Sequence, residues 1–565
     1  MNTEDSNSEA PPEIPAGETA APAGFIRKWT PLLVMSLALV IVLLDTTILN
    51  VTMRTIIRDL NTTLQNFQWV ITSYSLVLAS FTITGGRLGD IFGRRRMFVL
   101  GAILFAIGSI IASMSRGIES MILGESIIEG IGAALMLPAT ATLLRTSYEG
   151  HDRRLAFGVW GGIAAAAAAL GPLIGGWLTT HYSWRWAFRI NVVVVGFLLL
   201  GSTLIKETRA REKGIALDYI GVLLSATGLF CLVFGFIEAS THGWWFEKQP
   251  FTLWRRPLAP DGYSITPVFV AAGLAILSLF ALWEHRVQKA GRAPLVSLAL
   301  FRNSRFVTGT VISAIVALGQ AGLTFSIPVY LQAVLNLDPI DTGLALIPLT
   351  LTILVAAPFS ALISRFAVPK RVIQAGILAD AAGFLVLRHA LEVGATPMDL
   401  APGMSLFGFG LGLMIPQTSN LALSAVATEE SGEASGVHTA IRLTGATLGA
   451  AILGAIMISS LSGNLARGIA VSTVVPEPWK PAILKSVQVR MSSLELGAAD
   501  TIADSKLPQK VKDELHSLSN LATVNAGKTS LAYGALFVLG AFVLSFNLPG
   551  GTFLDFDRHP KQTPT

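Results

Sequence analysis

The stretch that decides the fold is GRLGDIFGRRR, residues 86–96. It joins two apolar runs, residues 67–86 and 97–115, each close to the roughly 20 residues that a helix needs to cross a bilayer. Glycine permits tight turns, and the stretch carries one carboxylate and several arginines. It therefore predicts a short charged loop that connects two membrane helices at one surface of the membrane.

Similar apolar runs recur along the whole chain. Of its 565 residues, 52% are hydrophobic and only 14% are charged, whereas soluble domains are about 25% charged. This composition excludes a soluble multidomain enzyme and a disordered or fibrous protein, and the lone Cys231 excludes a disulfide framework. The sequence predicts fourteen membrane-spanning helices, at residues 31–52, 67–86, 97–115, 120–141, 155–177, 187–205, 217–238, 266–284, 306–325, 341–362, 372–392, 400–423, 437–460 and 531–549.

The distribution of Lys and Arg predicts the orientation of these helices. With fourteen spans both termini lie on one side, which carries 23 Lys and Arg residues against 9 in the short loops opposite. The long segment 461–530 is discounted, because long loops cross the membrane largely regardless of charge. Both termini are therefore expected in the cytoplasm, with the chain in the inner (cytoplasmic) membrane. The net charge of +5 then reflects topology and headgroup contact, not nucleic-acid binding.

Two predicted external segments are longer than the short loops that join the other spans. Residues 243–265 contain Trp244, Trp245 and Trp254, and amphipathic rings favour the headgroup zone, so an interfacial loop is expected. Residues 461–530 are too polar to cross a membrane and contain two short amphipathic patterns, Val487–Leu496 and Lys510–Leu521. They predict either a small external cap or a long loop.

The charged loop and three further motifs resemble those of known transporters. Residues 86–96 resemble the G-x-L-x-D-x-x-G-R-R-R loop of the major facilitator superfamily. LDTTILNV (44–51) is similar to the L-D-x-T-x-x-N-V signature of its fourteen-span drug:proton antiporters, the EmrB/QacA type. GPLIGGW (171–177) resembles the antiporter motif G-P-x-x-G-G, and SWRWAFRINV (183–192) also matches that family.

The resemblance implies an all-α membrane fold, built from two six-helix bundles plus two extra central helices. It divides the chain into a disordered cytoplasmic tail (1–29), an N-terminal bundle (30–205), a linker with the two extra helices (206–305), a C-terminal bundle (306–549) and a second cytoplasmic tail (550–565). It also implies a gating loop and an antiporter motif, formed by Gly86, Asp90, Gly93, Arg94, Arg95, Gly171, Pro172, Gly175 and Gly176.

A physical reading of the loop agrees with such a gate. Asp90 can cap a helix start or pair with an arginine, so the loop could hold the cytoplasmic side closed and release it as the two bundles rock. The alternative is that Arg94–Arg96 only anchor the loop at the membrane surface.

Glutamates mark one departure from the family. Its fourth span usually carries G-R-x-x-x-Q-G, but here the stretch is GESIIEG (124–130), with Glu125 and Glu129 at the arginine and glutamine positions. Being four residues apart, the two glutamates share one helix face. Asp45 lies about 21 Å into the first span, counted from the cytoplasmic side, and Glu125 lies about 8–10 Å into the fourth span, counted from the external side. Across a hydrocarbon core of about 30 Å these two depths coincide.

Ionised carboxylates inside hydrocarbon cost several kcal/mol and therefore usually face a cavity and have a function. We expect Asp45, Glu125 and Glu129 to bind protons from outside and to exchange them for a cationic substrate. The alternative is that Glu125 pairs with Arg116 or Arg189 near the external surface.

Further polar and apolar residues lie in the second half. Asp380 and Arg442 are intramembrane charges for which pairing with a neighbour is expected. A substrate pocket, with ordinary packing as the alternative reading, is predicted from Gln320, Phe407, Met414, Gln417 and Asn420.

These observations predict a proton-coupled exporter of amphipathic, cationic small molecules that works by alternating access. The chain has no G-x-x-x-x-G-K-[ST] loop, so the proton gradient is expected to supply the energy, with neither cofactor nor metal. No catalytic cluster indicates an enzyme. The partners expected are the substrate, protons and membrane lipids, for a monomer with the option of a periplasmic adaptor. Export of an endogenous lipid, siderophore or secondary metabolite remains open, as does a transporter-like sensor or scaffold.

Overall fold

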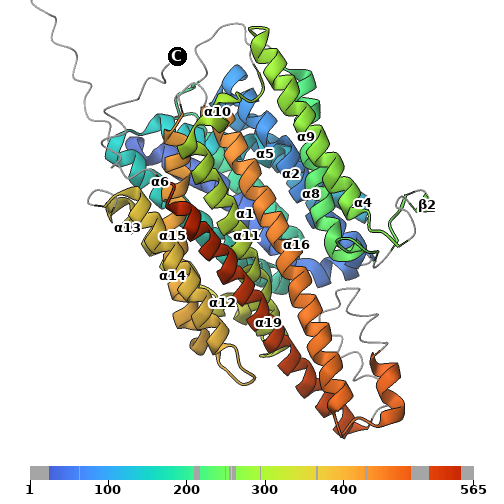
Figure 1. Ribbon diagram of the computed structural model, residues 1–565. Coiled ribbons are helices and arrows are strands. Elements are labelled where there is room, and N and C mark those ends of the chain that lie inside the picture. Colours follow the sequence, from blue (N-terminus) through green and yellow to red (C-terminus); the bar gives the residue numbers. More distant parts are fainter. Residues whose placement is uncertain are drawn as a thin grey trace, which may run out of the picture.

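The computed structural model describes residues 25–62, 64–208, 217–247, 250–253, 256–257, 262–292, 294–363, 367–426, 431–484 and 508–548. These residues are helical almost throughout (Figure 1). The helices of the first half and of the central segment are α1 (Phe25–Asp59), α2 (Leu64–Phe92), α3 (Arg94–Ser113), α4 (Ile118–Met121), η1 (Ile122–Glu129), α5 (Gly130–Ser147), α6 (Gly150–His181), α7 (Arg185–Ser202), α8 (Tyr219–His242) and α9 (Thr266–Lys289).

The second half follows the same plan. Its helices are α10 (Ala299–Arg302), α11 (Ser304–Ala333), α12 (Pro339–Ala345), α13 (Ile347–Ile363), α14 (Pro369–Ala390), α15 (Pro397–Ser424), α16 (Ser431–Val471), η2 (Glu477–Trp479) and α19 (Gln509–Ser545). The strands β1 (Thr252–Leu253) and β2 (Arg256–Pro257) pair as a small antiparallel hairpin.

Every predicted span coincides with a helix. Thirteen helical stretches among the described residues are long and apolar enough to cross a membrane, and the remaining predicted span, 155–177, lies within α6. The predicted span 120–141 is built from α4, η1 and α5 in succession. The first predicted tail is shorter than expected, because α1 already begins at Phe25. Residues 1–24 and the predicted tail 550–565 lie outside the described residues.

Local sequence signals set several helix starts. Asp218 accepts a hydrogen bond from Gly221 N at the start of α8, and Asn303 caps α11 in the same way. Thr396 and Asp399 form a capping box at the start of α15, which satisfies backbone donors on both sides. Proline stands at the first positions of α9, α12, α14 and α15, where its missing N–H costs nothing.

Two hydrophobic cores correspond to two helical halves. One core joins α1, α2, α3, α5 and α7, and the other joins α11, α13, α14, α15 and α19. Across the seam, α2 packs against α16, and α6 packs against α13. The extra pair α8–α9 packs on α2 and α16 through α8, so it covers this seam on one side (Figure 1).

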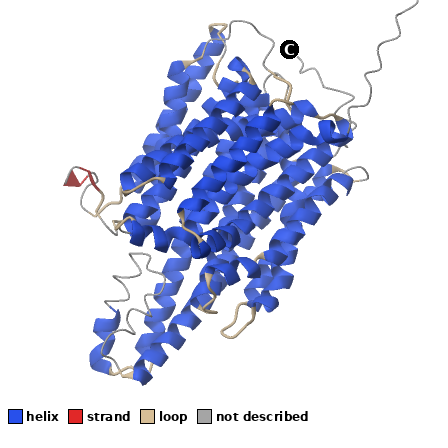
Figure 2. Cartoon of the chain, turned by 180° about the vertical axis from the view of Figure 1, so that it is seen from behind, coloured by secondary structure: helices blue, strands red, loops and turns tan. Residues whose placement is uncertain are grey.

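The two ends of the helix bundle differ. We call the end where α2 stops and α16 begins the gate end. At the opposite end α16 and α19 continue well beyond the other helices, and we call this projection the stalk (Figure 1 and Figure 2). The end of α16, the start of α19 and the residues after α16 pack together in the stalk through a small apolar cluster. Its members are Leu465, Ile469, Val475, Ile483, Val511, Leu515 and Ala522.

The stalk changes the prediction for residues 461–530. Much of this segment is the helical ends of α16 and α19, because their amphipathic faces bury apolar side chains against each other outside the membrane-spanning length. The pattern predicted as a short helix at Lys510–Leu521 is the first part of α19 and runs on without a break into the last span. The pattern at Val487–Leu496 lies outside the described residues.

The other predicted external segment, 243–265, lies between α8 and α9. It contains the β1–β2 hairpin and a bridge between Phe246 and Tyr263, which are 74% and 60% exposed. Trp245 is also exposed, whereas Trp254 lies outside the described residues. Exposed aromatic rings next to membrane helices suit the headgroup zone.

Asp59 ties three helices together at the stalk end. Its Oδ2 accepts hydrogen bonds from Trp184 Nε1 at 3.0 Å and from Arg185 Nη1 at 2.5 Å. Arg185 also donates to Ser115 O at 3.1 Å, so the end of α1 is joined to the start of α7 and the end of α3. The hydrogen bonds from Trp184 and Arg185 lower the pKa of Asp59.

This contact makes a small part of the stability depend on pH. The pKa of Asp59 is lower in the folded chain than its unfolded value of about 3.9, so its contribution is present above that value and is lost as pH falls through the folded pKa. We expect Asp59→Asn to lower the melting temperature at pH 7, by an amount that corresponds to about 1 kcal/mol or less. The difference should vanish in strong acid. A difference that stays constant with pH, or an equal effect of Glu119→Gln, would contradict this assignment.

Candidate functional site

A rare helix type carries the two glutamates. Residues 122–129 form η1, a π-helix, between α4 and α5, and both Glu125 and Glu129 lie within it. A π-helix closes its hydrogen bonds from i to i+5, and such segments occur frequently at functional sites. Its wider turn keeps residues four apart on one face. Gly108 and Gly124 let α3 and η1 approach closely at this level, since a Cβ added to Gly108 would lie 2.5 Å from Glu129 Cγ.

Asp45 of α1 completes an acidic cluster with Glu125 and Glu129. One carboxylate oxygen from each residue lies within 4.8 Å of the others. Asp45 is 3% exposed and both glutamates are fully buried. The structure therefore brings together the three acids that depth along the spans predicts at one level, and it joins neither glutamate to Arg116 or Arg189.

Two polar residues hold this cluster in place. Asn191 of α7 donates from Nδ2 to Asp45 Oδ1 at 3.0 Å and to Ser109 Oγ at 3.4 Å. Ser109 of α3 donates in turn to Glu129 Oε1. A chain of hydrogen bonds thus links α1, α7, α3 and η1. The motif at residues 183–192 contains Asn191 but does not indicate this role, and the only signal for Ser109 in the sequence is a polar residue in an apolar run.

The remaining oxygens of the cluster lack donors. Asp45 Oδ2, Glu129 Oε2 and both oxygens of Glu125 are buried with no hydrogen-bond partner among the described residues. Three carboxylates this close repel one another when ionised, and no arginine or lysine forms an ion pair with them in the described part of the chain. The arrangement can therefore hold protons or a bound cation. A divalent metal ion would also find oxygen ligands here.

Two glycines of the antiporter motif pack against α1, the helix that carries Asp45. Gly171 of α6 packs against Thr47 and Leu44 O of α1, and Gly175 packs against Ile48. A side chain at either glycine would push α6 away from the helix that carries Asp45. Gly176 is buried as well, and the side chain of Pro172 lies outside the described residues.

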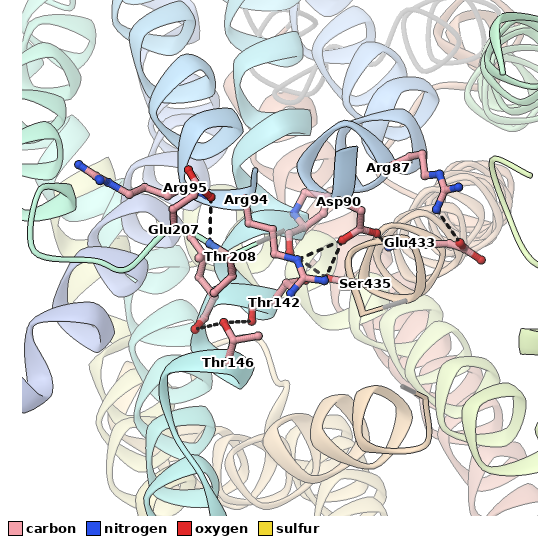
Figure 3. A network of polar contacts seen from close by, with 12 residues as sticks. Arg87, Asp90, Arg94, Arg95, Thr142, Thr146, Glu207, Thr208, Glu433 and Ser435 are labelled. Atoms are coloured by element: carbon pink, nitrogen blue, oxygen red, sulfur yellow. Dashed lines mark hydrogen bonds and ion pairs between the residues drawn. The ribbon is translucent and has the colours of Figure 1, made fainter. Parts of the chain in front are cut away.

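A second polar network closes the gate end (Figure 3). Asp90, at the end of α2, is held by Arg94 through bonds of 2.9 and 3.1 Å to Oδ1. Its other oxygen accepts the backbone N–H of Glu433 at 3.0 Å, in the first turn of α16. The start of a helix attracts negative charge, so Asp90 of the first half binds the first turn of a helix of the second half.

Glu433 reinforces this contact between the halves. Its carboxylate pairs with Arg87 at 3.5 Å and accepts the backbone N–H of Ser297. Gly86 and Gly432 make the close approach possible, because an added Cβ on Gly86 would lie 2.4 Å from Gly432 O. Sequence reasoning missed Glu433, which a single acid near the start of a span would not distinguish from an ordinary first-turn residue.

The rest of the charged loop is fixed by Glu207. Its carboxylate accepts the backbone N–H groups of Arg95 at 3.0 Å and Arg96 at 3.1 Å, at the start of α3. Gly93 precedes them with a φ of 110°, which side chains rarely adopt. The loop thus has a defined structure and does more than supply positive charge. The Arg95 side chain itself forms none of the gate contacts described above.

The predicted pocket residues of the second half divide into two groups. Gln320 and Met414 line one small cavity, together with Arg442. Phe407 instead stacks edge-on with Phe384 at 5.0 Å, and Gln417 Nε2 donates to Ser360 O and Oγ at 3.1 and 2.9 Å. Asn420 is buried and does not line that cavity.

Asp380 and Arg442 do not pair with each other. Asp380 of α14 is fully buried with no hydrogen-bond partner among the described residues, and it packs against Gly410 of α15. Arg442 lies on α16 at the cavity. The ion pairs among described residues include neither of them, contrary to the pairing that the sequence predicts.

The profile of the Major Facilitator Superfamily matches residues 35–450. The chain belongs to the major facilitator superfamily. This agrees with the two helical halves, the seam between them and the charged loop. The tetracenomycin C resistance and export protein of Streptomyces glaucescens is 32% identical to this chain, over 86% of this chain and 85% of its own length. A multidrug efflux pump of Mycolicibacterium smegmatis is 26% identical over 91% of this chain and 95% of its own.

The fold of this superfamily member also matches solved structures. The crystal structure of a human organic anion transporter has a TM-score of 0.54, with 92% of this chain and 99% of that chain covered. At 13% identity this likeness concerns the fold alone.

Proposed function

We propose that this superfamily member is a proton-coupled exporter of amphipathic, cationic small molecules. The observation that carries the proposal is the buried cluster of Asp45, Glu125 and Glu129, which is shared between α1 and η1. Its mutually repelling carboxylates take up protons readily and release them when a cation arrives. Resistance and efflux proteins among its relatives support drug-like substrates.

Alternating access links the cluster to the gate. In this structure the halves touch at the gate end through Asp90, Arg87 and Glu433. We propose that the gate end faces the cytoplasm of the inner membrane, that protons reach the acids from the stalk side, and that loading the cluster with a cationic substrate alternates with proton loading. The proton gradient then supplies the energy, without a cofactor. We propose that this transporter has no catalytic step and is therefore not an enzyme.

A single copy of the chain is proposed to suffice. Both halves and all three acids belong to one chain, so no subunit has to complete the site. A periplasmic adaptor, if it takes part, would find the stalk exposed on the outer side. The second candidate function is export of an endogenous lipid, siderophore or secondary metabolite. The name of the Streptomyces glaucescens relative supports export of one defined compound, because it joins resistance and export of tetracenomycin C.

Flux from sealed vesicles tests the proposal. The purified full-length chain is reconstituted in liposomes, and uptake of tetramethylrhodamine methyl ester, a permanent cation, is followed after a pH jump that makes the lumen acidic. We expect accumulation that exceeds the level in protein-free liposomes and that nigericin in symmetric K+ abolishes, because nigericin exchanges H+ for K+ and removes the pH gradient without charging the membrane. Accumulation that is the same with and without the pH gradient would contradict proton coupling, and no movement of any substrate in a susceptibility panel would favour the sensor or scaffold.

A further inference from the structure

A small cavity, mostly apolar but with an arginine in its wall, lies in the second half, away from the acidic cluster. It has a volume of about 30 Å³ and is bounded by α11, α15 and α16. This is room for about two water molecules, or for the two oxygens of one carboxylate. The polar side chains that line it are Ser313, Gln320, Thr418, Ser419 and Arg442.

The charge of Arg442 is not neutralised by the helices around the cavity. α11 contains no acid, α15 contains only Asp399, and α16 contains only Glu433. Asp399 caps the start of α15 at the stalk end. Glu433 precedes Arg442 by nine residues, about 13 Å along the helix, and is bound to Arg87 and Ser297. An arginine at membrane depth is costly unless an anion or water satisfies it.

A neighbouring histidine, His438, joins two of the helices that bound the cavity. His438 lies one turn before Arg442 on α16 and shares a 3.1 Å hydrogen bond between its Nδ1 and Thr310 Oγ1 of α11. Its Nε2 is buried without a partner among the described residues. The contact fixes α11 against α16 directly beside the cavity, so the Arg442 side chain has a rigid base.

The donors around the cavity match one ligand chemistry. Guanidinium presents paired N–H groups that fit the two oxygens of a carboxylate, and hydroxyl and amide groups add further donors. The remaining wall is apolar, formed by Val316, Ala317, Met414 and Ile415. This combination suits an acidic group that is attached to a hydrophobic ring system.

We infer that Arg442 and Gln320 form a subsite for a carboxylate or ionised phenol of the exported molecule. The inference rests on the proposed export function and narrows its substrate. A molecule with a basic group for the acids of the first half and an acidic group for Arg442 engages both halves at once. The chain then prefers zwitterionic amphiphiles over simple cations.

Two dyes that differ in one group test this inference. Tetramethylrhodamine has a free carboxylate beside its cationic ring system, and its methyl ester masks that carboxylate. Binding to the detergent-solubilised full-length chain is measured by fluorescence polarisation. We expect the free acid to bind at least about tenfold more tightly than the ester, because a hydrogen bond to a charged group is worth that factor or more.

Variants then assign the preference to Arg442. Arg442→Met should remove the preference, because it should weaken binding of the free acid and leave binding of the ester unchanged. Gln320→Leu should also weaken binding of the free acid, and it serves as the test if Arg442→Met does not fold. Arg467→Met is the matched control on the same helix, because this arginine hydrogen-bonds to Gly463 and Asn464 in the stalk. Equal binding of both dyes to the wild type, binding of neither, or an equal loss of both dyes in Arg442→Met overturns the inference. Discrimination without pH-driven flux would instead overturn only the export function.

Discussion

Replacing Asp45 by asparagine is expected to abolish pH-driven accumulation of a cationic substrate. The amide has nearly the same shape and still accepts the hydrogen bond from Asn191, but it cannot take up or release a proton. Positioned proton-transfer groups contribute about a hundredfold or more to the reactions that depend on them. Flux driven by a pH gradient should fall by about that factor, whereas the methyl ester dye should still bind, more weakly, through the carboxylates of Glu125 and Glu129. Flux and polarisation measurements on the same preparation separate the two.

Two further variants show whether the effect belongs to the cluster. Glu129→Gln should behave like Asp45→Asn, because a carboxylate oxygen of Glu129 lies within 4.8 Å of one of Asp45 and Glu129 is held by Ser109. Glu119→Gln changes an exposed glutamate of the same span and should leave flux unchanged. Wild-type flux in Asp45→Asn, with the protein folded, would show that no proton passes through this residue.

Replacing Gly432 by alanine is expected to open the gate end. An added Cβ would lie 2.3 Å from Asp90 Oδ1, so Asp90 or the start of α16 must move and the bond to Glu433 N is lost. Loss of a hydrogen bond to a charged group costs about 1.5–3 kcal/mol. The ratio of the closed to the open population at this end should therefore fall about ten- to a hundredfold, and flux should fall as well.

Thiol labelling measures this opening directly. Cys231 is the only cysteine, so Cys231→Ser gives a background in which Ser435→Cys reports on the gate. Ser435 is 1% exposed and donates to Pro138 O at 3.2 Å when the gate end is closed. Gly432→Ala should raise its labelling rate by a water-soluble reagent, whereas Gly454→Ala, where an added Cβ meets nothing within 4 Å, should not. Equal labelling in both variants would rule out the gate contact.

The membrane fold was predictable because hydropathy and length act locally. Each apolar run must satisfy its own backbone in lipid, which leaves a helix as the only choice, and every one of the fourteen runs is helical here. Depth arithmetic predicts that Asp45 and Glu125 meet, since spans cross a slab of fixed thickness. The same reasoning fails for Arg442, because pairing depends on how helices rotate about their axes.

Other features depend on contacts that no local pattern records. The π-helical turn around Glu125 arises where α3 presses on η1 through Gly108 and Gly124. The role of Glu433 depends on its position opposite Arg87, which is 346 residues away in the chain. The stalk formed where polarity predicts a loop, because α16 and α19 bury side chains such as Ile469 and Leu515 against each other.

The unbroken course of α16 has a mechanical consequence. This helix of 41 residues is about 61 Å long, starts at Asp90's binding partner, passes Arg442 and ends in the stalk. Because α16 is one continuous helix, a movement of its start at the gate end tilts the whole helix. The stalk at the opposite face of the bilayer is then displaced as well. An antibody fragment that binds the tip of the stalk should therefore arrest turnover without touching the transported molecule.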